Sequence, residues 1–151
     1  MRGRGSLAWM LLLSLPFFGG CGGPTDPVPE PIVLQGELTR GTQVSHDVPL
    51  ADSGVVRVEL IALTSTNQET GEVFDLTTSV LSFSLGRVNT ATGQSCSATF
   101  ATALAFETPL SVFLTPVERC ALVTDPGGLD PGGVIPEGFT WQYTIELSST
   151  Q

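Results

Sequence analysis

The 151-residue sequence contains no lysine, and all six of its basic residues are arginines. Fifteen acidic side chains stand against them and give a formal net charge of −9. A chain with so few cations cannot build the basic surface that neutralises phosphates, so we exclude nucleic acid as a partner. The sequence also has no apolar run of the roughly 18 residues that a membrane-spanning helix needs, which excludes an integral helical membrane protein.

Residues 1–20 have the pattern of an export signal. Two arginines precede an apolar run from Leu7 to Phe18, and Gly19 and Gly20 supply the small residues that a signal peptidase requires. The apolar run is too short for a helix that crosses a bilayer. We therefore predict a signal peptide over residues 1–20, which is removed on export.

The segment Phe18-Gly19-Gly20-Cys21 resembles the lipobox of bacterial lipoproteins, in which a small residue stands directly before the cysteine. The family usually has leucine where this sequence has Phe18. The resemblance implies cleavage after Gly20, a diacylglyceryl thioether on Cys21 and acylation of the new amino terminus. Several acyl chains, at about 0.8 kcal/mol per buried methylene, give a stable membrane anchor. The alternative is an ordinary signal peptide followed by a chance cysteine.

Residues 21–31 form a predicted tether between the lipid anchor and the rest of the chain. Prolines at positions 24, 27, 29 and 31 exclude a helix or a central strand. An extended chain of about 3.1 Å per residue would hold the domain roughly 30 Å from the anchor. Gly22 stands where inner-membrane lipoproteins of Gram-negative bacteria have aspartate, and this resemblance implies an outer-membrane location.

Residues 32–149 show the pattern of an all-β domain. No helical periodicity extends over a full window, and short runs alternate apolar with polar side chains. The run over 56–62 places Ala62 on the apolar face with Val56, Val58 and Leu60. Other strands are expected at 33–39, 42–48, 73–80, 81–85, 98–104, 110–114, 119–124 and, most clearly, 141–147.

These strands predict an antiparallel β-sandwich of the jelly-roll type. Short strands with one apolar face and no helices between them pair antiparallel and bury that face against a second sheet. We expect about eight strands, as in other sandwiches of this size, and a β-barrel is the alternative. A domain of about 118 residues buries enough surface to form such a core.

Cys96 and Cys120 remain as a pair once Cys21 is lipidated. Export to an oxidising compartment favours a disulfide between them. Closing a loop of about 25 residues would stabilise the fold by roughly 3 kcal/mol, mainly through the unfolded state. Two free buried thiols are the alternative.

Several segments resemble the strands of bacterial pre-peptidase C-terminal (PPC-type) sandwich domains. The opening strands match at Gly36-Glu37-Leu38, Gly41, Ser45-His46-Asp47-Val48 and Gly54–Leu60. The later strands match at Leu81–Gly86, Cys96, Cys120–Asp125 with Gly127-Gly128-Leu129, and Tyr143–Leu147. The Gly-x-Tyr that is usual before the late cysteine strand is replaced here by Val117-Glu118-Arg119. The resemblance implies an accessory module, since some such domains act in binding or in the secretion of attached enzymes, and a fold alone transfers no activity.

His46 is the one histidine, and it shares an alternation face with Val44 and Val48. A catalytic triad would need a serine on a sharp turn, and the sequence has no G-x-S-x-G motif. A cysteine nucleophile would need a free thiol, and one histidine with two separated cysteines does not give zinc spacing. We therefore expect His46 to be a strand residue with a structural hydrogen bond. We also expect that the protein is not an enzyme. A small secreted hydrolase that depends on His46 is the remaining alternative.

The segment from Asp125 to Gly133 contains Asp-Pro-Gly-Gly twice. Asp125 and Asp130, together with Glu137, could supply the oxygen ligands that calcium prefers. Their spacing matches neither an EF-hand nor a nonapeptide calcium repeat. Two consecutive tight turns are the alternative interpretation of the same residues.

Exposed aromatic rings would offer a platform for carbohydrate. Trp141 and Tyr143 share a strand face with core-type residues, whereas Phe139 follows a turn and is the better candidate for exposure. The leading hypothesis is a non-catalytic lipoprotein, anchored at the cell envelope, with a binding or structural role. Its rival is a carbohydrate- or protein-binding module with a calcium-stabilised loop at 125–137.

Overall fold

The computed structural model describes residues 29–89, 95–117, 120–127 and 133–150. The predicted signal peptide, Cys21, most of the predicted tether and Asp130 lie outside these residues. Within the described part, no helix has the length and apolarity to cross a membrane. The strands described are β1 (Ile32–Leu38), β2 (Gln43–Asp47), β3 (Gly54–Asn67), β4 (Val73–Asp75), β5 (Val80–Asn89), β6 (Ser95–Ala105), β7 (Leu110–Leu114), β8 (Cys120–Thr124) and β9 (Phe139–Thr150).

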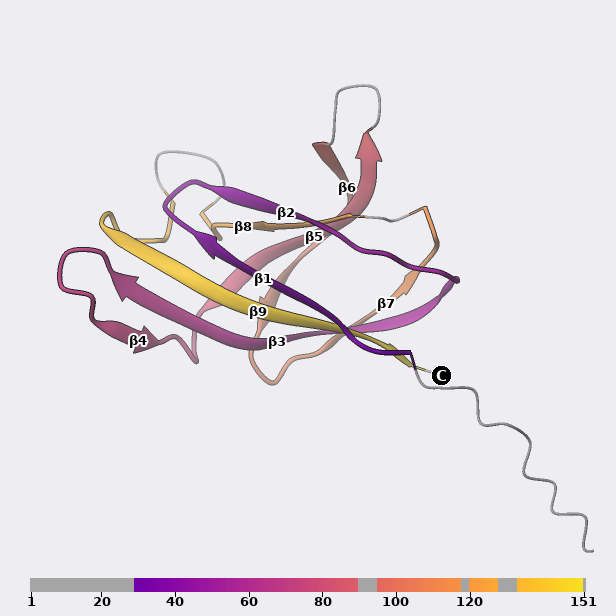
Figure 1. The fold of residues 1–151 in the computed structure, drawn as a ribbon, viewed down its shortest axis with the longest axis horizontal. Coiled ribbons are helices and arrows are strands. Elements are labelled where there is room, and N and C mark those ends of the chain that lie inside the picture. The colour runs from indigo at the N-terminus through magenta and orange to yellow at the C-terminus, as the bar shows by residue number, and fades with distance from the viewer. Residues whose placement is uncertain (1–28, 90–94, 118–119, 128–132, 151) are drawn as a thin grey trace, which may run out of the picture.

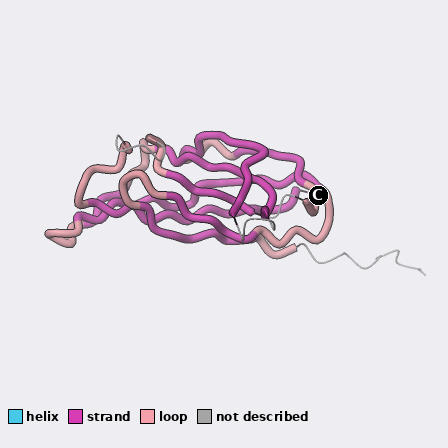
Figure 2. The backbone as a smooth tube through the Cα atoms, turned by 90° about the horizontal axis from the view of Figure 1, so that it is seen from above, coloured by secondary structure: helices cyan, strands magenta, loops and turns pink. Residues whose placement is uncertain are grey.

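The strands form two antiparallel sheets, and the predicted all-β sandwich is confirmed. One sheet has the order β1-β9-β3-β4, and β7 also pairs with β3. The other sheet has the order β2-β8-β5-β6. Figure 1 shows the arrangement of the strands, and Figure 2 shows that they run along the long axis with loops gathered at the ends.

The strand registers give the sandwich two distinct ends. β1 begins and β9 finishes at the same end, because Ile32 pairs with Leu147; we call it the entry end. At the opposite end Leu38 pairs with Trp141, and β3 finishes beside the start of β9. We call this the turn end, because the β1–β2, β3–β4 and β8–β9 connections lie there (Figure 1).

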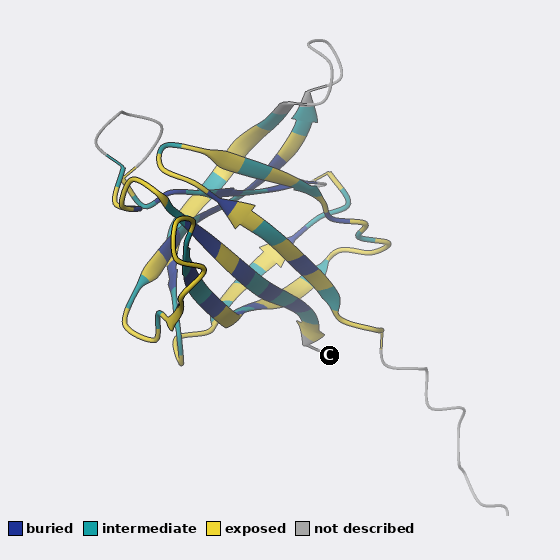
Figure 3. Ribbon diagram, turned by 60° about the vertical axis from the view of Figure 1, so that its left-hand side comes forward, coloured by how far each residue is buried: buried dark blue, intermediate teal, exposed yellow. Residues whose placement is uncertain are grey.

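The core lies between the two sheets and is built from the inward faces of the alternating strands. Figure 3 shows this alternation as dark blue and yellow bands along the ribbon. Burying one such side chain contributes roughly 1.5–3 kcal/mol relative to leaving it exposed. Four inward side chains of β9 are 5% exposed or less: Trp141, Tyr143, Ile145 and Leu147.

A β-bulge in β3 changes which side chains face the core. The pairing of β3 with β9 shifts between Leu60 and Ala62. Leu60 and Leu63 are buried, and Ile61 and Ala62 both face outward. The prediction that Ala62 shares the apolar face is therefore wrong, because a period of two holds only up to the bulge.

The strand expected over 73–80 is also interrupted. β4 ends at Asp75 and β5 begins at Val80. Between them the Leu76 N–H donates to the Leu63 carbonyl at 3.0 Å, and the Ser79 N–H donates to the Leu76 carbonyl at 3.3 Å. These bonds turn the chain from one sheet into the other, so the predicted single strand is two strands in different sheets.

The predicted disulfide between Cys96 and Cys120 is present. β5 lies between the strands that carry these residues, and strands two apart in a flat sheet are about 9–10 Å apart. The two Cα atoms are nevertheless only 5.8 Å apart. The pairing of β5 with β6 shifts at Gly86, where an added Cβ would lie 2.0 Å from the Ser97 carbonyl oxygen. The missing side chain of Gly86 therefore lets β6 approach closely enough for the disulfide to close.

Replacing Gly86 with alanine should destabilise the sandwich, because the new Cβ would overlap the Ser97 carbonyl. We expect the free energy of unfolding to fall by about 1–3 kcal/mol, the usual cost of overpacking, in urea denaturation followed by tryptophan fluorescence. Gly54→Ala is the matched control, because nothing lies within 4 Å of a Cβ at Gly54. Equal stability of the two variants would contradict the close passage of β6 over β5.

Candidate functional site

Asp125, directly after β8, organises the turn end of the sandwich. Its side chain is 0% exposed. The carboxylate accepts hydrogen bonds from the backbone N–H groups of Gly41 (3.0 Å), Gly127 (3.0 Å), Val134 (2.9 Å) and Ile135 (3.4 Å). Burial raises the pKa of this carboxyl, but the four N–H donors outweigh burial and hold the pKa below its ordinary value. The charged side chain of Asp125 is thus hydrogen-bonded to both the β1–β2 turn and the β8–β9 connection, and it holds the two together.

Three turns meet at this end, over residues 39–42, 67–72 and 133–138, and together we call them the turn cluster. In the first turn the Thr42 hydroxyl donates to the Thr39 carbonyl at 2.8 Å. The same hydroxyl oxygen accepts from the Thr39 N–H at 2.9 Å. The shape of this turn is therefore fixed by the Thr42 side chain, in addition to the hydrogen bond that the Gly41 N–H donates to Asp125.

The second and third turns are bonded to each other. The Gln68 backbone N–H donates to the Gly138 carbonyl at 2.8 Å, and the Gln68 side-chain amide donates to the Thr140 hydroxyl at 2.6 Å. Within the second turn, the side-chain oxygen of Asn67 accepts from the Glu69 N–H at 2.9 Å. Because all these bonds are internal to the protein, the fold itself holds the turn cluster in shape.

A hollow of about 320 Å³ lies between the turns, near the lower limit for small-molecule sites. Its walls include Arg40, Gln68, Glu137 and Phe139. Arg40 and Glu137 are exposed, and Phe139 is half-buried. The hollow therefore combines a cation, a carboxylate, an amide and an aromatic ring, and we take it as the candidate site.

The entry end offers a larger but less polar hollow. It measures about 490 Å³ and adjoins the loop between β2 and β3. A binding site normally places several polar groups where they converge on a ligand. Asp47 is the one lining residue of this hollow with a polar side chain. The other lining residues are Val48, Pro49, Leu50, Ala51 and Val88.

The three predicted calcium ligands have different surroundings. Both carboxylate oxygens of Asp125 are engaged by backbone N–H groups, Glu137 is exposed in the third turn, and Asp130 lies outside the described residues. In the part of the chain that the structure describes, no group of three or more His, Cys, Asp or Glu is placed to hold a metal ion. The calcium site stays a prediction, while the bonding of Asp125 favours the turn interpretation.

The aromatic residues divide as the alternation pattern indicates. Trp141 and Tyr143 are buried and cannot serve as an exposed carbohydrate platform. Phe139 is partly accessible, and its ring centroid lies 6.5 Å from that of Phe74. The sequence did not single out Arg40 in the first turn or Phe74 on β4, because only the strand registers place them at the same end of the sandwich. Gly41 and Gly71 were the available turn signals.

His46 has the structural hydrogen bond expected for it. Its Nε2 atom lies 2.6 Å from the Tyr143 hydroxyl oxygen, and this contact joins β2 of one sheet to β9 of the other. Burial lowers the pKa of His46, and the charge of Asp47 partly opposes that shift. Burial also raises the pKa of Tyr143, so a neutral imidazole facing a protonated phenol is favoured. The partner of this nitrogen is therefore the buried phenol of Tyr143.

The sequence matches no protein-family model, and the search of curated proteins finds no relative. One solved chain, from Bacillus endospore appendages described as a novel family of disulfide-linked pili, is 8% identical to this chain. The alignment covers 82% of this chain and 93% of that chain, with a TM-score of 0.31. At such a TM-score the likeness carries no argument about fold or function.

Asp125→Asn should destabilise the protein by about 3 kcal/mol at neutral pH, because the amide loses the charge that the backbone donors stabilise. The pKa of Asp125 is lowered in the folded state, so its contribution is complete above the ordinary pKa of 3.8 and is lost as pH falls through the folded value. In urea denaturation the difference between wild type and variant should shrink below that pH. Asp52→Asn, at an exposed site, is the control, and a constant difference at all pH values would contradict the assignment.

The free energy of unfolding should also depend on pH through His46, the one histidine in the chain. Because its pKa is lowered in the folded state, the stabilisation is complete above the ordinary pKa of 6.5 and is lost as pH falls from there through the folded value. In His46→Gln this dependence should disappear in urea denaturation between about pH 5 and pH 8. Tyr143→Phe should keep it, because burial is the main cause of the shift. An unchanged slope in His46→Gln would show that another group titrates.

Proposed function

We propose that this protein is a lipid-anchored envelope protein whose β-sandwich acts as a non-catalytic binding or structural module. The lipobox-like segment ending at Cys21, with the apolar run before it, supports acylation of that cysteine. The proline-rich segment 21–31 supports a tether. Gly22 after the cysteine supports the outer membrane, and the PPC-like strand motifs support an accessory role.

The observation that carries this proposal is the separation between the two ends of the sandwich. The chain enters β1 at Ile32, at the entry end, whereas the turn cluster follows Leu38 at the other end (Figure 1). β1 has seven residues, and at about 3.3 Å per residue they span roughly 20 Å. A module tethered at its entry end would hold the turn cluster away from the membrane surface.

The charge of the chain supports anchoring by lipid rather than by electrostatic attraction. The whole sequence has a net charge of −9, and the predicted cleavage after Gly20 would also remove Arg2 and Arg4. Anionic headgroups repel so acidic a chain, since their surface potential attracts lysine and arginine instead. Several acyl chains buried in the bilayer would supply the attachment that the acidic surface of the protein cannot provide. The same repulsion keeps the acidic sandwich clear of the bilayer.

Cys21→Ser should abolish the lipid modification. Cells grown with radiolabelled palmitate should incorporate label into the wild-type protein and not into this variant, because the thioether forms on Cys21. The double variant Cys96→Ser/Cys120→Ser is the matched control: it loses the disulfide and should keep the label. Label retained in Cys21→Ser, or no label in the wild type, would contradict the proposed anchor.

A further inference from the structure

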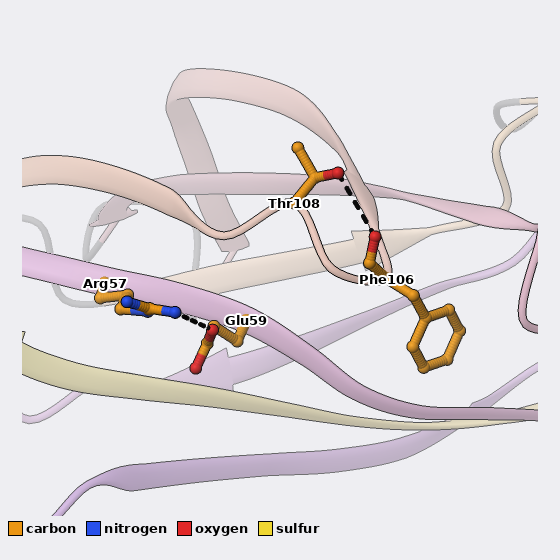
Figure 4. Close-up of polar contacts among 4 residues, drawn as sticks. All are labelled: Arg57, Glu59, Phe106 and Thr108. Atoms are coloured by element: carbon orange, nitrogen blue, oxygen red, sulfur yellow. Dashed lines mark hydrogen bonds and ion pairs between the residues drawn. The ribbon is translucent and has the colours of Figure 1, made fainter.

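The hollow of the turn cluster contains two charges that the protein itself does not pair. In the described residues, neither Arg40 nor Glu137 makes a side-chain hydrogen bond or ion pair. Arg57, by contrast, pairs with Glu59 on β3 (Figure 4), and Arg87 also has an interaction partner. Among the arginines that the structure describes, Arg40 is therefore the one left to bind something else.

An aromatic surface accompanies these charges. Phe139 lines the hollow, and the ring of Phe74 lies beside it, tilted by 46°. Phe74 is 42% exposed. A ligand in the hollow would therefore meet an apolar ring as well as polar groups, and aromatic rings carry much of the binding energy in such sites.

This combination of groups selects a class of ligand. An anionic ligand would be repelled by Glu137 and by the excess of acidic residues in the chain, and a cationic ligand would leave Arg40 without a partner in the hollow. A neutral ligand with hydroxyl groups satisfies both residues, because a hydroxyl accepts a hydrogen bond from a guanidinium and donates one to a carboxylate. Hydrogen bonds to ionised groups are also roughly twice as strong as neutral ones.

We propose that the turn cluster binds a neutral saccharide, an inference that rests on the proposed function as a binding module. The C–H face of one sugar ring packs on Phe139, and Arg40 and Glu137 bind neighbouring hydroxyl groups. The hollow of about 320 Å³ is of a size that a short saccharide segment can occupy.

The test is isothermal titration of the full protein, purified with its anchor in a detergent that has no sugar headgroup. The probes are cellotetraose, xylotetraose, chitotetraose and maltotetraose. We expect at least one to bind with a Kd at or below about 1 mM. Arg40→Ala and Glu137→Gln should each weaken that binding by about tenfold, since each removes a charged hydrogen-bonding partner. Phe139→Leu should do the same while keeping the apolar volume.

Two variants outside the hollow are the matched controls. Phe113→Leu changes a ring that is 65% exposed on β7, and Arg57→Ala removes an arginine that already has a partner. Both should bind like wild type, and thermal unfolding checks that every variant is folded. Absence of binding by all four probes overturns the proposal, and so does an equal loss of affinity in the controls.

The outcome for the saccharide is distinguishable from the outcome for the proposed function. Palmitate labelling tests the anchor whether or not a sugar binds. Suppose that the wild-type protein binds none of the four probes but can be cross-linked to a single envelope protein. If Arg40→Ala loses that cross-link, the ligand of the hollow is a protein. That result overturns the saccharide and leaves the binding module in place.

Discussion

The buried carboxylate of Asp125 is the interaction on which the turn end depends. A charge that is 0% exposed is tolerated only when hydrogen bonds replace its lost hydration, and here four backbone N–H groups do so. One donor, Gly41, is 84 residues away in sequence. The bond therefore fixes the backbone of the β1–β2 turn, which includes the neighbouring Arg40. Gly133 is part of the same arrangement, because a Cβ at this position would lie 2.2 Å from Oδ2 of Asp125.

The two sheets are joined by polar contacts as well as by the apolar core. The Tyr143 phenol reaches His46 across the sandwich by passing over Gly36, where a Cβ would lie 2.4 Å from the hydroxyl oxygen. A glycine in β1 therefore allows a side chain of β9 to reach β2. Among the described residues, no buried side-chain nitrogen or oxygen lacks a hydrogen-bond partner. A satisfied interior of this kind favours one rigid arrangement of the sheets.

The fold was more predictable from the sequence than the candidate site. Alternation predicts β9 and its core face well, because the side chains of that face from Trp141 to Leu147 are buried. The disulfide was predicted from the export signal expected over residues 1–20, since export would bring the chain into an oxidising compartment. The prediction fails at Ala62, since a bulge leaves no mark in a period-two pattern. Arg40, Gln68 and Glu137 lie in three separate turns, and only the registers of β1, β3 and β9 bring them together. The sequence marks Asp125 as an acidic residue beside glycines, but it does not predict which backbone N–H groups bind its carboxylate.

The rigidity of the turn cluster sets the affinity that the proposed site can have. The backbone of each turn is already fixed by internal hydrogen bonds, so binding orders little more than the side chains of Arg40 and Glu137, each at up to about 1.5–2 kcal/mol. A single small hollow offers few contacts beyond these, and modest affinity for one saccharide segment follows. An anchored protein compensates for this, because many copies in one membrane can engage repeated units of a polymer and gain avidity without new contacts. The proposed anchor would therefore raise the effective affinity of the proposed site for a polymer.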